Sequence, residues 1–130
     1  MSDTPLRLLV VGAHPDDCEV RAGGLTAMYR DLGHEVYFLS MTNGATGHHD
    51  MGGVELARRR REEADAVAAA NGIEYTILDN HCGELEPNVA NRKEVIRQIR
   101  QIQPDLVLTH RPWDYHPDHR YTGMLVQDAS

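Results

Sequence analysis

Cysteine is scarce in this chain of 130 residues, which contains only Cys18 and Cys82. The two lie far apart and outside any Cys-x-x-Cys spacing, so the sequence indicates neither a disulfide framework nor a structural zinc site of paired cysteines. A chain without disulfides fits a reducing compartment, and we expect a cytoplasmic location. Stability must then come from a hydrophobic core, and 41% hydrophobic residues are consistent with one globular domain.

Clustered positive charge and long apolar runs are also lacking. The formal net charge is −7 and no extended basic tract is present, which argues against nucleic acid as a partner because such binding rests on clustered Lys and Arg. No stretch approaches the roughly 20 apolar residues of a membrane-spanning helix, so we expect no membrane span. The N-terminus has neither a basic flank nor a cleavage site, so no targeting signal is visible.

Short hydrophobic runs alternate with segments of helical periodicity along the chain. The predicted strands cover residues 7–12, 35–41, 75–78 and 105–109. Gly33, Gly72 and Pro104 mark the ends of the three helices between them. A fourth helix is predicted to begin near Tyr121 and to be cut off by the chain end, so the C-terminal part of the fold looks truncated. Strict alternation predicts an α/β fold, a Rossmann-like three-layer α/β/α sandwich with a mostly parallel sheet.

Two polar tetrapeptides follow the first and fourth predicted strands. His-Pro-Asp-Asp occupies residues 14–17, and His-Pro-Asp-His occupies 116–119, about a hundred residues later. If the strand order is 3-2-1-4, the first and fourth strands are neighbours whose connections run to opposite faces, which opens a crevice at their carboxyl ends. Both tetrapeptides are expected to meet there. His and Asp are usual ligands of zinc-type metals, and a catalytic site needs three of them plus a water.

Each tetrapeptide also has a purely structural interpretation. Residues 14–17 can form a polar turn in which Pro15 fixes the backbone and an Asp caps the next helix. Residues 116–119 can form a solvated turn. Both interpretations would have to hold together, so the metal hypothesis is the stronger one. A nicotinamide cofactor is disfavoured, because Gly12 is not followed by the later glycines of a dinucleotide fingerprint.

The residue types in these motifs suit metal-assisted hydrolysis. Adjacent carboxylates need not face the same way, so one can bind the metal while the other acts as general base on the metal-bound water, whose pKa falls from about 16 to about 7. In the second tetrapeptide, the Asp can orient one imidazole, ready to stabilise an oxyanion or to protonate a leaving nitrogen. Such a layout suits hydrolysis of an amide or an ester.

The motif Ala-His-Pro-Asp-Asp at residues 13–17, followed by His-Pro-Asp-His at 116–119, resembles the PIG-L/LmbE family of zinc-dependent N-acetylglucosaminyl de-N-acetylases. Thr-Asn-Gly at 42–44 and the Arg-rich helix with Arg60 and Glu63 also match the usual layout of that family. The resemblance covers the whole chain, and the paired tetrapeptides are specific. Members of the family are usually longer than this chain, with further C-terminal elements that help to close the substrate pocket.

The resemblance implies a cofactor and roles for individual residues. The implied cofactor is Zn²⁺, with Mn²⁺ or Fe²⁺ as alternatives because His and Asp do not select zinc uniquely. The implied metal ligands are His14, Asp17 and His119. The implied catalytic residues are Asp16 as general base, His116 as oxyanion stabiliser and acid, and Asp118 behind His116.

Asn43 and Arg60 are the candidate substrate contacts. Arg60 shares a helical face with Ala57 and Ala64, which should pack on the sheet, so its side chain should point inward or along the rim of the crevice. For Arg60, a substrate contact and a structural pair with Glu63 are equally open.

The remaining histidines and the second cysteine have open roles. His48 and His49 lie in a Gly-rich segment that we expect to be an exposed mobile loop, with metal or sugar contacts as the alternative. We expect His81 and Cys82 to be structural or rim residues, and His110 to line the pocket.

The sequence predicts a single metal-hydrolase domain over residues 1–130, corresponding to the N-terminal portion of the family. The predicted function is removal of an N-acetyl or other N-acyl group from an amino-sugar conjugate of the N-acetylglucosamine type. Trp113 and Tyr115 then either stack on a sugar ring or cover the core. A non-catalytic metal- or sugar-binding module is the alternative. Asp16 favours the enzyme, since a binding site has no need of a second carboxylate beside its ligand. The expected partner is a small-molecule conjugate, and a homo-oligomer stays open.

Overall fold

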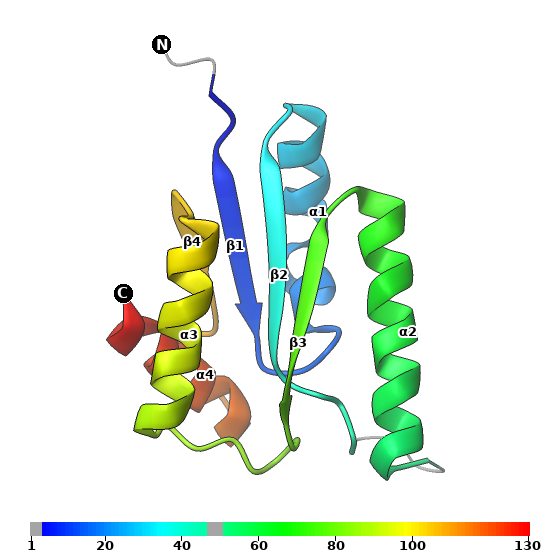
Figure 1. Cartoon of the computed structure of the whole chain (residues 1–130), viewed down its shortest axis with the longest axis vertical. Coiled ribbons are helices and arrows are strands. Elements are labelled where there is room, and N and C mark those ends of the chain that lie inside the picture. The colour runs from blue at the N-terminus through cyan, green and yellow to red at the C-terminus, as the bar shows by residue number, and fades with distance from the viewer. Residues whose placement is uncertain (1–3, 47–50) are drawn as a thin grey trace.

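The described part of the chain folds into a four-stranded sheet with helices on both faces (Figure 1). The structure is a computed structural model that describes residues 4–46 and 51–130. The strands are β1 (Arg7–Gly12), β2 (Glu35–Thr42), β3 (Glu74–Asn80) and β4 (Leu106–Leu108). The helices are α1 (Asp17–Asp31), α2 (Gly53–Asn71), α3 (Val89–Ile102) and α4 (Pro117–Ala129). The strand order is β3-β2-β1-β4 and every strand pair is parallel. The predicted α/β sandwich and its strand order are confirmed.

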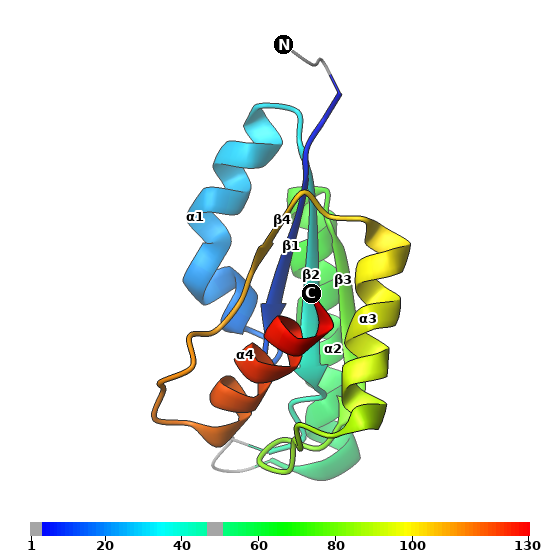
Figure 2. The same cartoon turned by 90° about the vertical axis from the view of Figure 1, so that its left-hand side faces the viewer.

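The two faces of the sheet bury alternate residues of the same strand. Leu8 and Val10 of β1 pack with residues of α1 and α2, whereas Leu9 and Val11 pack with residues of α3 and α4. Figure 2 shows α1 and α3 on opposite sides of the sheet. A parallel sheet covered on both faces needs apolar residues in both directions, which is why β1 reads as a continuous apolar run. Each such buried side chain contributes about 1.5–3 kcal/mol relative to exposure.

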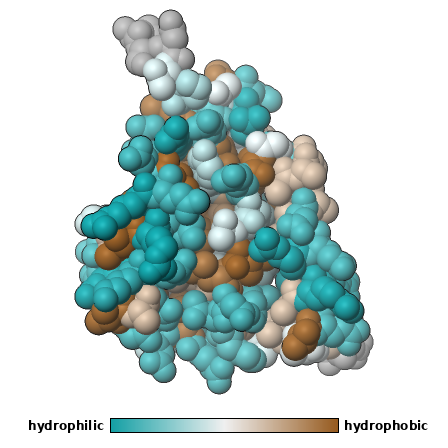
Figure 3. All heavy atoms as spheres, in the orientation of Figure 1, coloured by the Kyte–Doolittle hydropathy of each residue, from teal (hydrophilic) through white to brown (hydrophobic). Residues whose placement is uncertain are grey.

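One face of the molecule is largely polar (Figure 3). On the face seen in Figure 3, hydrophilic residues cover most of the surface, and hydrophobic residues show through in the middle, between α3 and α2. Within the described residues, no helix combines the length and the apolar composition that crossing a bilayer requires. Residues 47–50, which include His48 and His49, lie outside the described part, so the predictions made for them are not addressed by the structure.

The start of the fourth helix differs from the prediction. α4 begins at Pro117 and not near Tyr121, so the second tetrapeptide lies in its first turn. Apolar periodicity starts only at Tyr121, but proline at the first helical position is the stronger signal, because its φ is fixed at a helical value and its missing N–H needs no partner there. The imidazole of His116 caps the helix, since its Nδ1 accepts a hydrogen bond from Asp118 N at 3.0 Å. His119 is therefore held on a helix.

Gly12 allows the end of β1 to meet the start of α1. A Cβ at this position would lie 2.8 Å from Asp17 Cβ and 3.1 Å from Cys18 Sγ, which is too close for any residue with a side chain. The contact brings Asp17 against the carboxyl end of the strand, where the two tetrapeptides meet.

Gly12→Ala should destabilise the chain by about 1–3 kcal/mol, the usual cost of overpacking. Gly24→Ala is the matched control, because a Cβ at that position in α1 meets nothing within 4 Å. Alanine in place of glycine inside a helix stabilises by about 0.5–1 kcal/mol. Thermal unfolding followed by circular dichroism should show a lower midpoint for the first variant only. Equal midpoints for the two variants would contradict the close approach.

Candidate metal centre

The carboxyl ends of β1 and β4 lie side by side, and the His and Asp side chains that follow them form one cluster. Ligand atoms of His14, Asp17 and His119 all lie within 4.8 Å of one another. His14 Nδ1 is 3.2 Å and His119 Nε2 is 3.3 Å from Asp17 Oδ2. Two imidazole nitrogens and one carboxylate oxygen thus face a common point. This is the donor set of a three-ligand catalytic zinc site, so the three residues fit a divalent metal ion.

In each of these imidazoles, the ring nitrogen that points away from Asp17 contacts a buried carboxylate. Asp118 Oδ2 lies 2.9 Å from His14 Nε2, and Asp114 Oδ1 lies 2.9 Å from His119 Nδ1. An ionised carboxylate only accepts, so these two nitrogens carry the protons. When a metal ion replaces the proton on the other nitrogen, the lone pairs of His14 Nδ1 and His119 Nε2 are free to bind it on the side of Asp17. Outer carboxylates that fix the tautomers of metal-binding histidines in this way are the usual surroundings of a metal site.

The carboxylate of Asp118 contacts His14, whereas the family resemblance implies that it stands behind His116. Asp118 is fully buried and also accepts a hydrogen bond from Gly83 N at 2.6 Å. Its Oδ2 is 4.0 Å from His116 Nδ1, and that nitrogen is already bonded to the backbone N–H of Asp118. The reason for the difference is the early start of α4, because His116 caps the helix while the side chain of Asp118 points into the protein.

His116 lines the cleft next to the cluster with its imidazole ring. Because Nδ1 accepts a backbone hydrogen bond, a neutral ring carries its proton on Nε2. Among the described residues, Nε2 of His116 has no hydrogen-bond partner. It is therefore a donor available to a bound molecule, which suits stabilisation of a developing oxyanion.

Asp16 stands at the N-cap position of α1, but its side chain does not cap the helix. Within the described part of the chain, its carboxylate makes no hydrogen bond, and it lines the same cleft as His116. Burial and the neighbouring charge of Asp17 raise the pKa of Asp16, against the opposing effect of Arg60. The purely structural interpretation of residues 14–17 needed a capping carboxylate, which Asp16 is not. An unpaired carboxylate with a raised pKa has the properties of a general base.

The carboxylates around His14 favour a positive charge at this point. Burial alone would lower the pKa of His14, but hydrogen bonds to Asp17 and Asp118 outweigh it and raise this pKa to about 9. Burial likewise opposes ionisation of Asp17, but the nearby rings of His110 and His14 and the backbone N–H of His14 bring its pKa well below the usual range. A site that stabilises an imidazolium between carboxylates also suits a cation that replaces the proton.

The cleft beside the cluster has a volume of about 260 Å³. Its polar lining comes from His14, Asp16, Thr46, Arg60, Cys82 and His116. The guanidinium of Arg60 forms an ion pair with Glu63 at 2.9 Å. The side chain of Arg60 also lines the cleft, so a contact with substrate stays a prediction. Gly44, at φ 74°, makes room for this arginine, since a Cβ there would lie 2.7 Å from Arg60 Cγ.

Asn43 has its amide engaged in the loop after β2. It donates to Asp79 Oδ1 at 2.9 Å and accepts from Ala45 N at 3.0 Å. Its side chain is not part of the cleft lining. A substrate contact through Asn43 therefore stays a prediction without support from this geometry.

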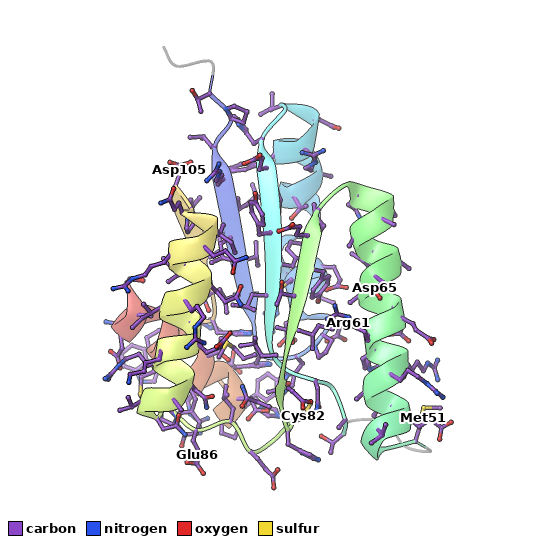
Figure 4. All side chains as sticks on the ribbon, viewed as in Figure 1. Met51, Arg61, Asp65, Cys82, Glu86 and Asp105 are labelled. Carbon is purple, nitrogen blue, oxygen red and sulfur yellow. The ribbon has the colours of Figure 1, made fainter. Side chains whose placement is uncertain are left out.

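The other residues with open roles lie at different depths around the cluster. Cys82 lines the cleft and lies 3.2 Å from Thr42 Oγ1; Figure 4 shows it at the end of the sheet opposite to Asp105. His110 supports the cluster from behind: its ring stacks on that of His119 with centroids 4.2 Å apart, and its Nε2 lies 3.4 Å from Asp17 Oδ2.

The two aromatic residues of the β4–α4 segment do not cover the core. Trp113 is 83% and Tyr115 is 81% exposed. The ring of Tyr115 lies 5.5 Å from that of His119, so it borders the cluster. Stacking of these rings on a sugar stays a prediction.

Asp114 is the residue of the cluster that the sequence analysis did not single out. It precedes His116 by two positions, and its Oδ1 accepts a hydrogen bond from His116 N at 3.1 Å. An Asp side chain that accepts a hydrogen bond from the backbone N–H two residues later forms a common type of turn. The Asp at position 114 was therefore a recognisable turn residue in the sequence.

A parallel sheet with a His and Asp cluster at the carboxyl ends of its strands places the chain among the α/β proteins that carry their functional site at such a switch point. Within that class, the family model described as PIG-L, GlcNAc-PI de-N-acetylase, matches residues 9–130. The chain belongs to this family.

Individual relatives share both sequence and fold with the chain. It is 38% identical over 129 residues to diacetylchitobiose deacetylase of Thermococcus kodakarensis, with 95% of this chain and 48% of that protein covered. It is 31% identical to 4-oxalmesaconate hydratase of Pseudomonas putida, with 93% and 50% covered. The structure of N,N'-diacetylchitobiose deacetylase from Pyrococcus horikoshii superposes with a TM-score of 0.87 at 35% identity, covering 95% of this chain and 48% of that one. The chain thus spans about half the length of these relatives.

Asp118→Asn should weaken Zn²⁺ binding by about 10- to 100-fold, the usual effect of removing a carboxylate behind a ligand histidine. His116→Ala should leave the affinity within about twofold if the metal binds to His14, Asp17 and His119, and should lower it strongly if the metal binds instead to His14, His116 and Asp118, whose ligand atoms also lie within 4.8 Å of one another. His119→Ala provides the reference for loss of a whole ligand. Competition with a chromophoric chelator measures all three affinities. Metal affinity that depends on His116 and not on Asp118 would contradict the arrangement described above.

Proposed function

We propose that the chain is a metal-dependent deacetylase that removes an N-acetyl group from an amino sugar or its conjugate. The observation that carries the proposal is the position of Asp16, an unpaired carboxylate beside a convergent His14, Asp17 and His119 at the wall of a cleft. The names of the relatives from Thermococcus and Pyrococcus support the substrate class. Zn²⁺ is the proposed ion, with Mn²⁺ and Fe²⁺ as alternatives for the same donors. A single domain, a cytoplasmic location and the state of assembly stay predictions.

Different residues around the cleft perform different steps of amide hydrolysis. His14, Asp17 and His119 would hold the metal ion, which would supply Lewis-acid polarisation and lower the pKa of water. Asp16 accepts the proton of the attacking water, and His116 donates its Nε2–H to the carbonyl oxygen as negative charge develops there. The proton held by Asp16 then passes to the leaving nitrogen as the C–N bond breaks. Amide and water are thus converted into acetate and a free amine.

Asp118 supports this chemistry through His14, and not as the partner of His116. The Nδ1 of His116 is occupied by the backbone, so this ring acts as a hydrogen-bond donor and not as the proton source for the amine. That role falls to Asp16, whose raised pKa suits a group that takes up a proton and releases it again.

The carboxylate of Asp16 disfavours a negatively charged group next to it in the cleft. Among the described residues that line it, Asp16 contributes a carboxylate, and the guanidinium of Arg60 is already paired with Glu63. An N-acetylated sugar carries no charge at the reacting amide, so it meets no repulsion from Asp16. The relative named as a hydratase makes addition of water to a double bond the second reaction to test.

Acetate release tests the proposed function directly. The purified chain, loaded with Zn²⁺, is incubated with diacetylchitobiose and with N-acetylglucosamine, and acetate and free amine are quantified. We expect equal amounts of the two products, and we expect chelation of the metal to stop the reaction. A chain that binds both metal and sugar but releases no acetate would instead be a binding module, the alternative that the sequence left open.

Asp16→Asn should keep the metal but lower turnover by about 10²- to 10⁴-fold, because an amide cannot accept the proton of water. Asp128→Asn is the control, since it makes the same charge change at an exposed position of α4. The rates come from the acetate assay, and metal content comes from atomic emission. Turnover that is unchanged in Asp16→Asn would remove this residue from the mechanism.

A further inference from the structure

Asp114 lies between β4 and α4 with its side chain only 5% exposed. A single oxygen, Oδ1, accepts hydrogen bonds from His119 Nδ1 at 2.9 Å and from His116 N at 3.1 Å. The backbone carbonyl of the same residue accepts from Arg120 Nη1 at 2.7 Å. Both the carboxylate and the main chain of Asp114 are therefore tied to α4 and its cap.

The ring of His119 is restrained on two sides. His110 stacks on its face with an interplanar angle of 5°, which sets the plane of the ring. The hydrogen bond to Asp114 sets its rotation in that plane and leaves Nε2 directed at Asp17 Oδ2, 3.3 Å away. Without an acceptor at Asp114, the proton of His119 has no reason to remain on Nδ1, and the nitrogen that faces Asp17 can lose its lone pair.

The same oxygen connects two parts of the centre that have different tasks. His119 belongs to the donors that converge on Asp17, and His116 lines the cleft, where its Nε2–H is available to a substrate. Because Asp114 Oδ1 accepts hydrogen bonds from the ring of His119 and from the backbone N–H of His116, it restrains the proposed metal ligand relative to the backbone that carries the oxyanion donor. A shift of about 1 Å between such groups is enough to cost 10²-fold in rate.

We propose that Asp114 is a positioning residue of the metal centre, which fixes the tautomer of His119 and holds His116 in register with it. The inference rests on the proposed metal site. Asp114 lies outside the proposed ligand set of His14, Asp17 and His119, and in this proposal it acts through His119 and His116.

A purely structural role in the turn is the competing explanation, and two substitutions separate it from the proposal. Asp114→Asn retains an oxygen that can accept both hydrogen bonds, so the turn is kept while the negative charge on His119 is lost. Asp114→Ala removes the acceptor altogether. A residue that only shapes the turn would tolerate Asn, whereas a residue that makes His119 a stronger donor needs the charge.

The test measures metal binding without substrate, so it does not depend on the deacetylase reaction. For Asp114→Asn we expect Zn²⁺ affinity to fall by about 10- to 100-fold, the unfolding midpoint of the chelator-treated protein to stay within a few degrees, and the visible bands of bound Co²⁺ to shift. For Asp114→Ala we expect at least the same loss of affinity and, at saturating metal, a lower kcat with KM little changed. Asp128→Asn, an exposed carboxylate on α4, is the control for net charge and should bind like wild type.

Each outcome decides one of the claims. Asp114→Asn that binds Zn²⁺ within twofold of wild type, with an unchanged Co²⁺ spectrum, would overturn the positioning role and leave the metal centre in place. Wild-type protein that binds no divalent ion would overturn the metal centre itself. If Asp114→Ala fails to fold, the Asn variant and its Co²⁺ spectrum still decide the question.

Discussion

The parallel pairing of β4 with β1 is the interaction on which the rest of the site depends. It rests on three residue pairs, Leu8 with Leu106, Leu9 with Val107 and Val10 with Leu108, and each one joins parts of the chain that are far apart in sequence. Such pairing is entropically costly to form, because a long loop must close first. Polar side chains extend it beyond the strand: Thr109 Oγ1 donates to Val11 O at 3.0 Å, and His110 Nε2 accepts from Ala13 N at 3.1 Å. The contacts that close the sheet therefore lead directly into the cluster.

The charged side chains of the cluster stabilise one another, and each would be energetically unfavourable without the others. Asp118 is fully buried, and an isolated carboxylate at such a position would be strongly destabilising. It is stabilised by His14 and by the backbone N–H of Gly83. Asp114 and His119 satisfy each other in the same way. Among the described residues, the second oxygen of Asp118, Oδ1, is buried without a hydrogen-bond partner. Asp16 and the Nε2 of His116 also have no hydrogen-bond partner there, and these two groups line the cleft. Burial of paired charges adds little net stability, so we attribute the arrangement to function.

The sequence predicts the fold and the meeting of the two turns well, for a simple physical reason. Alternating apolar runs and helical periods leave few topologies, and a strand order of 3-2-1-4 brings the ends of the first and fourth strands together. It was harder to predict from the sequence which side chains of the cluster contact one another. Asp118 contacts His14 and not His116 because α4 begins at Pro117, and a shift of a helix start by four residues redirects every side chain in its first turn. Asp114 was missed because its importance comes from a contact across that turn, at a single oxygen.

We propose that the turns after β1 and β4 together hold one divalent ion. A crystal of the chain grown with Zn²⁺ and measured at the zinc absorption edge tests it most directly. We expect one anomalous peak, bonded to His14 Nδ1, an oxygen of Asp17 and His119 Nε2 at the roughly 2.0–2.2 Å typical of zinc with nitrogen and oxygen ligands. A peak bound to other residues, or bound through His14 Nε2 with Asp118 as a direct ligand, would contradict it.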